Sequence, residues 1–346
     1  MSKNKNFFFR IDSNQKIGLG HLARCLILAN ILKEKCYFVV DTIKNNKLFK
    51  NLNYDFISLY NNEKYKNEIS DAKKLYKIVK KFNNANLIVD DYRLGIKWHN
   101  YFRKQNIKII AIDDLLNKKF NSDIYVNYKL DHSKEFKAGL KKLVNKDSIK
   151  LIGPKFSIFE QKLKKKKDKF FNIMLNFGNS FDFKNIYKEV IKIHRFIDIK
   201  LKNLIIYIAI GNGAQNYKPI MNYSKKHKNF KIIYRKFGIA KYLNKVDLFI
   251  GSASTSIYEM SFLMTPSIFV ICNKTQDYKI LEIEKLGHYF LINLKEFKSK
   301  NFIIFLNNFL NNFQSIKNLF FSRKIIVDNM GAHRVAQAIK KIDNVL

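Results

Sequence analysis

A single histidine, His21, stands where a glycine-containing loop runs into a helix, and such a position can hold an active-site base. Gly18 and Gly20 precede it, residues 7–11 are typical of a buried strand, and apolar residues recur at helical spacing from Leu22 onward. The N–H groups and the dipole at a helix N-terminus favour an anionic ligand and lower the pKa of an imidazole. We therefore predict that His21 is a general base whose pKa lies below its usual value.

His21 also has a simpler explanation as a capping or packing residue, because glycine loops after strands open many unrelated nucleotide-binding folds. The loop has no third glycine at the spacing of a dinucleotide-binding fingerprint, and it lacks the Lys-Ser/Thr pair of a phosphate-binding loop. The residues around His21 have to decide between the two roles.

Carboxylates follow two other expected strands of the first half. Asp90 and Asp91 come after residues 87–89, and Asp113 and Asp114 come after residues 107–112. Such pairs can bind a metal or transfer protons, but neighbouring side chains on an extended chain point to opposite faces, so at most one of each pair faces a site. Aspartates at strand ends often form turns and cap helices, and we expect no metal site.

Small polar loops follow expected strands of the second half. Residues 251–256 are rich in backbone N–H and hydroxyl donors and precede a helix, which is suited to a diphosphate, and Glu259 in that helix could accept hydrogen bonds from ribose hydroxyls. An ordinary Ser/Thr cap explains the same residues equally well. Gly178 and Asn179 form a second candidate loop, because glycine permits close backbone approach; turn formation alone is the alternative.

The elements that must position these residues alternate between apolar strands and amphipathic helices, which predicts a parallel α/β architecture. A chain of 346 residues exceeds a single core, so we expect two doubly wound, Rossmann-like domains that bind ligands beyond the carboxyl ends of their strands. The expected strands are 7–11, 36–40, 87–89, 107–112 and 124–126, then 171–175, 204–208, 230–234, 248–250 and 267–271, with a helix at 71–82.

The boundary between the domains is expected near 150–168, where a lysine-rich run at 163–169 is typical of a solvated connector. The first domain would span 1–155 and carry His21, and the second would span 165–320. Residues 321–346 would end in a helix that packs back on the first domain.

The charge balance is strongly basic, with 65 Lys and Arg against 28 Asp and Glu and a formal net charge of +37. A non-catalytic protein that binds nucleic acid or an anionic surface is therefore one candidate class. However, 57 of the 65 basic residues are lysines spread along the whole chain, whereas arginine is preferred for bidentate phosphate and base recognition. We expect no nucleic-acid partner.

Membrane insertion and disulfides are not expected either. The longest weakly charged run, 248–272, contains Glu259 and Pro266, so it is better explained as buried strands and a helix than as a membrane span. The N-terminus has too short an apolar stretch for a secretory signal. Three cysteines without metal-like spacing indicate free thiols and a cytoplasmic protein.

Taken together, these segments resemble the nucleotide-sugar hydrolases of pseudaminic acid biosynthesis, which remove UDP from a 2,4-diacetamido-2,4,6-trideoxy-altrose donor. That family is related in fold to the MurG-type GT-B glycosyltransferases, so the resemblance implies a GT-B fold with a cleft between its domains. It spans nearly the whole chain. The matching positions are Arg10, Asp12, Ser13, Ile17, Gly18, Gly20, His21, Arg24, Cys25, Leu26, Leu28, Ala29, 88–90, Tyr92, Asp113, Asp114, 252–259, Gln276, Val327, Asp328, Gly331, Ala332, Arg334 and Val335.

Carried over residue by residue, the resemblance implies that His21 is the catalytic base and that Tyr92 lines the sugar site. It implies no cofactor, and a UDP-sugar is the expected partner of a monomeric enzyme. The other implied substrate-binding residues are Asp12, Gly20, Arg24 and Asp90. The implied UDP-binding residues are Gly178, Asn179, Ile239, Ser254, Thr255, Ser256, Glu259 and Gln276, with Ile239 at the uracil and Glu259 at the ribose.

Two positions depart from the family pattern, because Gly178-Asn179 replaces a Gly-Gly pair and Thr275-Gln276 replaces an Asn-Gln pair. The expected reaction is attack of water on the anomeric carbon with UDP as the leaving group. A glycosyltransferase in which a sugar hydroxyl replaces the water is the nearest alternative, and the basic binding protein is the second.

Overall fold

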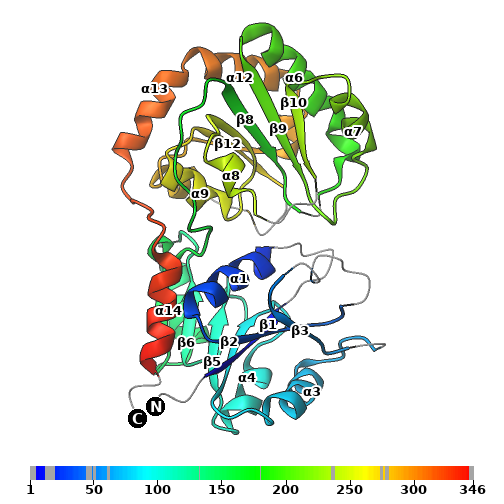
Figure 1. Cartoon of the computed structure of the whole chain (residues 1–346). Helices are drawn as coiled ribbons and strands as arrows, with labels where there is room; N and C mark the ends of the chain where they lie inside the picture. The colour runs from blue at the N-terminus through cyan, green and yellow to red at the C-terminus, as the bar shows by residue number, and fades with distance from the viewer. Residues whose placement is uncertain are drawn as a thin grey trace. The chain divides into compact units, whose positions relative to one another are not determined.

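A computed structural model of the chain describes residues 5–11, 20–43, 49, 52–60, 63–131, 133–179, 181–234, 238–272, 276 and 280–342 (Figure 1). The chain divides into two compact units. Unit 1 comprises Met1–Ile158 and Met330–Leu346, and unit 2 comprises Phe159–Asn329. Residues 321–329 therefore belong to unit 2, and the last helix belongs to unit 1.

Unit 1 is built on a seven-stranded sheet in the order β3-β2-β1-β4-β5-β6-β7, and all of its strand pairs are parallel. The run Phe7, Phe8 and Phe9 is fully buried, as expected for a central strand covered on both faces. The strands are β1 (Asn6–Ile11), β2 (Lys35–Val40), β3 (Asp55–Ser58), β4 (Ala85–Asp90), β5 (Lys108–Ile112), β6 (Ile124–Asn127) and β7 (Ile149–Ile152).

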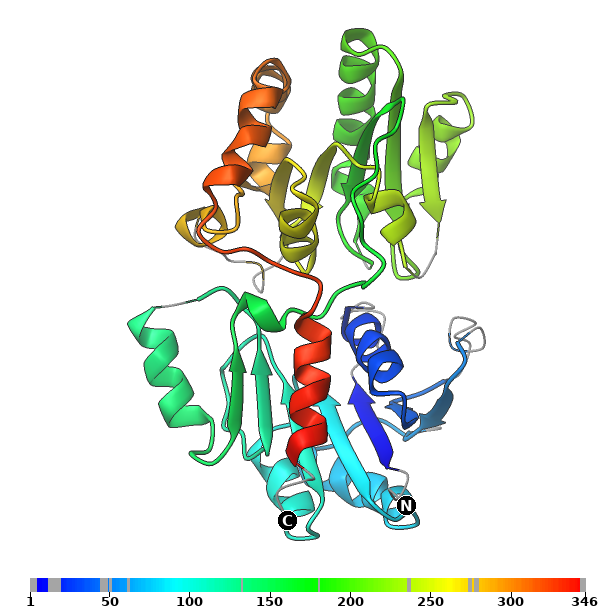
Figure 2. The same ribbon diagram turned by 60° about the vertical axis from the view of Figure 1, so that its left-hand side comes forward.

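Helices cover both faces of this sheet. On one face α3 (Glu68–Val79) contacts α4 (Ile96–Arg103). In unit 1, α14 (Gly331–Ile342) packs beside α1 (Gly20–Leu32), as Figures 1 and 2 show. Gly331 begins α14 where a Cβ atom would lie 2.2 Å from the carbonyl oxygen of Ser157, so a larger residue could not occupy that position. The remaining elements are α5 (Lys134–Leu143) and the 3-10 turn η1 (Pro154–Phe156).

Unit 2 is built on a six-stranded parallel sheet in the order β10-β9-β8-β11-β12-β13. The strands are β8 (Phe171–Asn176), β9 (Leu204–Ile210), β10 (Phe230–Tyr234), β11 (Leu248–Ser252), β12 (Ser267–Ile271) and β13 (Phe290–Asn293). The other elements are η2 (Phe183–Asn185), α6 (Tyr187–Lys200), α7 (Lys218–Ser224), α8 (Ala240–Leu243), α9 (Ser256–Leu263), α10 (Ile280–Glu284), α11 (Leu294–Phe297), α12 (Asn301–Asn311), α13 (Phe313–Asn318) and η4 (Leu319–Ser322).

Both sheets change direction beside their first strand. In unit 1 the chain runs outward from β1 to β3 and then returns to place β4 on the other side of β1, and in unit 2 the same switch separates β8 from β11. Ligands of doubly wound sheets bind beyond the carboxyl ends of the strands at such a switch. We therefore expect the ligand sites of the two units at the loops after β1, β4, β8 and β11.

The doubly wound fold predicted from the sequence is confirmed in each unit. Three strands were missed: β3, β7 and β13. Each lies at an edge of its sheet, has four residues and is only partly buried, so its sequence lacks the long apolar run of a central strand. Among the described residues, no helix combines the length and the hydropathy needed to cross a membrane.

Candidate active site

The centre of the site in unit 1 is a hydrogen bond between His21 and Asp90. His21 is the second residue of α1, and Asp90 ends β4 at the β1–β4 switch. His21 Nδ1 lies 2.5 Å from Asp90 Oδ1, and the two residues are 6% and 0% exposed. An ionised carboxylate only accepts hydrogen bonds, so in the neutral ring Nδ1 carries the hydrogen and Nε2 has the lone pair. In the described part of the chain, Nε2 has no hydrogen-bond partner, which leaves it able to accept a proton.

Arg24 holds the same carboxylate from one turn further along α1. Its Nε and Nη2 donate to the two oxygens of Asp90 at 2.6 and 2.5 Å, which is a bidentate pair of fixed geometry. Its Nη1 donates to Asp114 and to the hydroxyl of Tyr128, both at 2.8 Å. The guanidinium thus donates to Asp90, Asp114 and Tyr128, and it fixes the orientation of the Asp90 carboxylate.

Tyr92 completes the site, two residues after Asp90. Its hydroxyl donates to Asp114 Oδ2 at 3.0 Å. Its ring packs edge-on against the imidazole of His21, with ring centres 4.7 Å apart and an interplanar angle of 86°. His21, predicted to be the base, and Tyr92, predicted to line the sugar site, are therefore in direct contact.

The pKa values of the pair follow from burial and charge. Burial raises the pKa of Asp90, but Arg24 and His21 outweigh it and hold the pKa of that carboxyl well below its usual value. Burial lowers the pKa of His21, while the charge of Asp90 and its hydrogen bond raise it, and the net pKa is raised. The expectation of a lowered pKa is wrong, because the charge of Asp90 and its hydrogen bond at 2.5 Å outweigh the effects of burial and of the Arg24 charge.

Unit 1 contains a second buried ion network, which the sequence had not led us to predict. Arg10 of β1 is fully buried and donates to Asp71 at 2.7 Å and to Asp41 at 2.6 Å. Arg93 donates to Asp41 and to Asp91 at 2.7 and 2.6 Å. The signal in the sequence was an arginine inside an otherwise apolar strand, which demands buried partners.

The two aspartate pairs separate as predicted. Asp90 accepts from His21 and Arg24, whereas Asp91 accepts from Arg93. Asp113 accepts from the backbone N–H of Leu116 and from the hydroxyl of Tyr125. Within the described residues, no group of three or more His, Cys, Asp or Glu side chains could hold a metal ion.

Unit 2 presents a different kind of loop at its β8–β11 switch. Gly178 follows β8 with a φ of +101°, a conformation that favours glycine. The side chain of Asn179 accepts from the backbone N–H of Asn212 at 3.0 Å, where Gly211 approaches closely. Both predicted residues thus shape the turn after β8, with the amide oxygen of Asn179 already engaged inside unit 2.

The loop after β11 leads into the N-terminus of α9. Ser256 donates to the carbonyl oxygen of Ser252 at 2.6 Å, which closes the loop on itself. Thr255 occupies the N-cap position without a side-chain capping bond, and Ser254 is exposed. Helix α9 therefore lacks the ordinary Ser/Thr cap that was the alternative explanation of this loop. No side chain caps the first N–H groups of the helix.

Glu259 lies in the first turn of α9 and is half-buried. In the described part of the chain its carboxyl has no hydrogen-bond partner. Burial and the nearby carboxylate of Glu160 raise its pKa to about 7. A ligand hydroxyl that donates to such a carboxyl would bind favourably, because a buried polar group without a hydrogen bond is costly in free energy.

The remaining predicted residues are placed as follows. Ile239 immediately precedes α8 and is half-exposed, and the oxygen of the Gln276 side chain accepts from the backbone N–H of Cys272 at 2.9 Å. Gly20 is exposed, with open space around a Cβ atom built on it. Asp12, Ser13, Gly18 and Thr275 lie outside the described residues.

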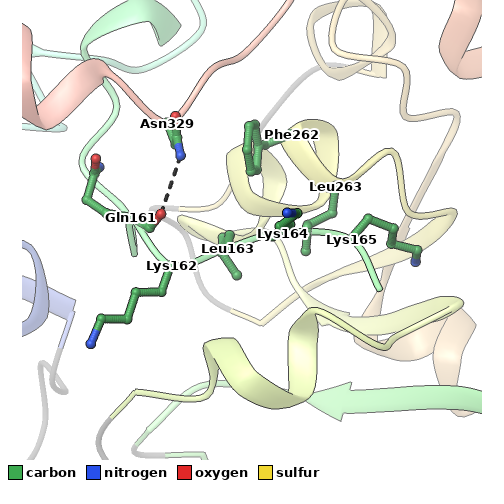
Figure 3. Close-up of a pocket in the computed structure, with 8 residues that line it drawn as sticks. All are labelled: Gln161, Lys162, Leu163, Lys164, Lys165, Phe262, Leu263 and Asn329. Carbon is green, nitrogen blue, oxygen red and sulfur yellow. Dashed lines mark hydrogen bonds between the residues drawn. The ribbon is translucent and has the colours of Figure 1, made fainter. Parts of the chain in front are cut away.

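A separate hollow of about 470 Å³ in unit 2 contains none of the predicted site residues. Figure 3 shows it beside the connector that starts unit 2 and beside Phe262 and Leu263 at the C-terminal end of α9. Its lining residues are Gln161, Lys162, Leu163, Lys164, Lys165, Phe262, Leu263 and Asn329.

Comparison with solved structures defines the class of fold. The chain is similar to MurG of Acinetobacter baumannii, with a TM-score of 0.62 and 14% identity over 97% of this chain and 99% of that one. It is similar to a putative UDP-N-acetylglucosamine 2-epimerase of Listeria monocytogenes, with a TM-score of 0.65 and 10% identity over 99% and 98%. It also resembles S. aureus MnaA in a structure with UDP, with a TM-score of 0.61, 10% identity, and coverage of 99% and 98%. The fold is the two-domain fold of GT-B glycosyltransferases and these epimerases.

Comparison by sequence supplies one particular relative. The chain is 24% identical, over 286 residues, to the UDP-2,4-diacetamido-2,4,6-trideoxy-beta-L-altropyranose hydrolase of Campylobacter jejuni, and the match covers 81% of this chain and 96% of the relative. No family model matches the chain. The resemblance deduced from the motifs is confirmed by this relative.

Proposed function

We propose that this protein is a hydrolase that cleaves a UDP-linked 2,4-diacetamido-2,4,6-trideoxy hexose into UDP and the free sugar, within nonulosonic (pseudaminic) acid biosynthesis. The observation that carries the proposal is the His21–Asp90 pair, in which Nδ1 of the imidazole is held by a buried carboxylate and Nε2 has no hydrogen-bond partner among the described residues. The similarity to the Campylobacter jejuni hydrolase supports the choice of substrate.

In the proposed reaction, Nε2 of His21 removes a proton from a water molecule as the water attacks the anomeric carbon. The bond from that carbon to the diphosphate oxygen breaks, and UDP leaves with the bonding electron pair. The proton taken by His21 is returned to solvent after UDP departs. Direct attack by water predicts inversion at the anomeric carbon.

The neighbours of His21 have separate roles in this scheme. Asp90 fixes the tautomer and orientation of the ring and stabilises the imidazolium that forms, and Arg24 keeps Asp90 ionised and aligned. Tyr92 packs on the imidazole and would contact the sugar. Because the Asp90 carboxyl is fully buried, we propose that Asp90 does not touch the substrate and acts on it through His21.

Unit 2 would hold the UDP moiety. The N-terminus of α9, which has no side-chain cap, and the hydroxyls of Ser254 and Thr255 suit a diphosphate. Ser256, whose hydroxyl already donates to Ser252, would contribute its backbone N–H. The unpartnered carboxyl of Glu259 suits the ribose hydroxyls. The other proposed UDP contacts are Gly178, Asn179, Ile239 and Gln276. The proposed reaction needs no cofactor or metal.

The test is incubation of the purified protein with a panel of UDP-diacetamido-trideoxy hexoses and no acceptor, followed by mass spectrometry. A hydrolase releases UDP and free sugar in equal amounts. The MurG-like fold keeps a glycosyltransferase as the second candidate; it would leave the donor intact until a sugar acceptor is added. Absence of free sugar with every donor would contradict the proposal.

A further inference from the structure

Two neighbouring loops of unit 1 carry the groups around His21. The first loop, residues 91–95, follows Asp90 of β4 and contains Tyr92, and the second, residues 113–118, follows β5 and contains Asp114. The strands pair directly, so their carboxyl ends lie side by side. The hydroxyl of Tyr92 donates to Asp114, which joins the far end of the tyrosine to the second loop.

Lys118 joins the near end of the same tyrosine to the same loop. Its Nζ donates to the backbone carbonyl oxygens of Asp91 and Tyr92 at 3.1 and 2.8 Å. The side chain is half-buried, and its Cδ would lie 3.2 Å from a Cβ atom built on Gly95. The stem of Lys118 is thus packed along the first loop, and its charge satisfies two main-chain acceptors at the base of the site.

We propose that Lys118 is a positioning residue for the reaction: it ties the first loop to the second and thereby holds the Tyr92 ring against His21. The bond from its hydroxyl to Asp114 restrains the Tyr92 ring, and the bond from Lys118 to its carbonyl restrains the backbone that carries the ring. Loss of either bond lets the ring move away from His21. In the described part of the chain, Lys118 hydrogen-bonds to Tyr92 at this backbone carbonyl alone. It therefore influences His21 through the position of Tyr92. The inference rests on the proposed hydrolysis.

The chain offers a matched control in the same unit. Lys150 is also half-buried and donates to three backbone carbonyls, those of Asn145, Lys146 and Ser148, at 3.0 to 3.1 Å. It lies at β7, at the far edge of the sheet from β1. If the loss of hydrogen bonds to the main chain were the whole effect, Lys118→Met and Lys150→Met would change kcat to the same extent. The single tryptophan, Trp98, is fully buried in unit 1, and its fluorescence verifies that each variant is folded.

The experiment measures kcat and KM for UDP release by the wild type, Lys118→Met, Lys118→Arg and Lys150→Met. We expect Lys118→Met to lower kcat about 10- to 100-fold with KM changed less than about 3-fold, because displacement of a group near the chemistry acts on the transition state. Lys118→Arg, which keeps the donors, restores most of kcat, and Lys150→Met leaves kcat at the wild-type value. Equal kcat values for Lys118→Met and Lys150→Met would overturn the proposal.

The second readout is coupling to Tyr92. In a Tyr92→Phe background the effect of Lys118→Met should shrink to about 3-fold or less, because the two changes remove one arrangement. Additive effects would overturn the proposal. Hydrogen exchange by mass spectrometry separates it from the hydrolase assignment: Lys118→Met must speed exchange at residues 91–95, and Lys150→Met must not. If the wild type releases no UDP, the hydrolase proposal fails, and unchanged exchange at 91–95 would then refute the tie by itself.

Discussion

The two units place their candidate residues at the same topological position but use different kinds of side chain there. At the switch of unit 1, the ionisable side chains of His21, Arg24 and Asp90 are buried and bonded to one another. At the switch of unit 2, the turns present glycine, asparagine and serine, and the carboxyl of Glu259 is shifted toward its neutral form. The sheet decides where a site lies, and the side chains decide its chemistry.

This difference has a physical reason. A side chain that takes up a proton needs neighbours that stabilise its charged form, so buried carboxylates beside His21 are useful in unit 1. A loop that holds a diphosphate needs N–H and hydroxyl donors, which the small polar turns of unit 2 supply. We therefore expect substitutions in unit 1 to affect turnover and stability and those in unit 2 to affect nucleotide binding.

The largest effect is expected from Asp71→Asn, which tests how strongly unit 1 depends on its buried ions. Asp71 is fully buried and accepts from Arg10, Trp98 and Tyr60. The variant leaves the charge of Arg10 undercompensated, which costs about 3–5 kcal/mol in the free energy of unfolding. Guanidinium titrations followed by circular dichroism measure this loss.

The control for that prediction is Lys74→Met, which breaks an exposed ion pair with Glu63 in the same unit. It should cost less than about 1 kcal/mol. If Asp71→Asn were no more destabilising than this control, the buried network would not contribute to the stability of unit 1.

Next in size is His21→Asn, which should lower turnover about 100-fold or more, as removal of a general base does. Binding of UDP should remain at the wild-type affinity, because the proposed UDP contacts lie in unit 2. Turnover is measured by UDP release, and UDP affinity by isothermal titration calorimetry. Turnover near the wild-type rate would remove His21 from the mechanism.

Asp90→Asn should lower turnover about 10- to 100-fold, because the imidazole loses its fixed orientation. It should also move the acidic limb of the kcat/KM profile to lower pH. The base works when unprotonated, and Asp90 raises the pKa of His21, so removal of the carboxylate lets His21 remain unprotonated at lower pH. A limb that stays in place or moves to higher pH would contradict the assigned pair.

Glu259→Gln tests the ribose contact in unit 2 and should weaken UDP binding about 5- to 10-fold at high pH, the cost of one charged hydrogen bond. With a pKa of about 7, the wild-type carboxyl is protonated as the pH falls, so UDP affinity should fall through that range. The variant should show no such dependence. Identical pH profiles of the dissociation constant would exclude Glu259 from the nucleotide site.

The smallest effect is expected from Ser254→Ala, which removes one exposed hydroxyl at the start of α9. One neutral hydrogen bond contributes about 1 kcal/mol, so KM should rise about 3- to 5-fold with kcat unchanged. A fall in kcat without a change in KM would mean that this loop takes part in the chemical step and would weaken the division between the units.

Part of this site could be predicted because it depends on local pattern. His21, Tyr92, Asp90 and Ser254 follow or precede strands that are visible as apolar runs, and parallel sheets bring strand ends together. The partners of Arg10 and Arg24 could not be predicted in this way. They lie 31 to 104 residues away in the sequence, in different elements, and many carboxylates and tyrosines at strand ends were equally available.

By itself the sequence determined the alternation of strands and helices, the two doubly wound units and the residues at the ends of the central strands, since these follow from the periodicity of apolar side chains. The tertiary structure alone decided that Asp90, 69 residues from His21, holds the imidazole and raises its pKa. Electrostatic energy depends on distance through space and on burial, and both are set by how the strands pair.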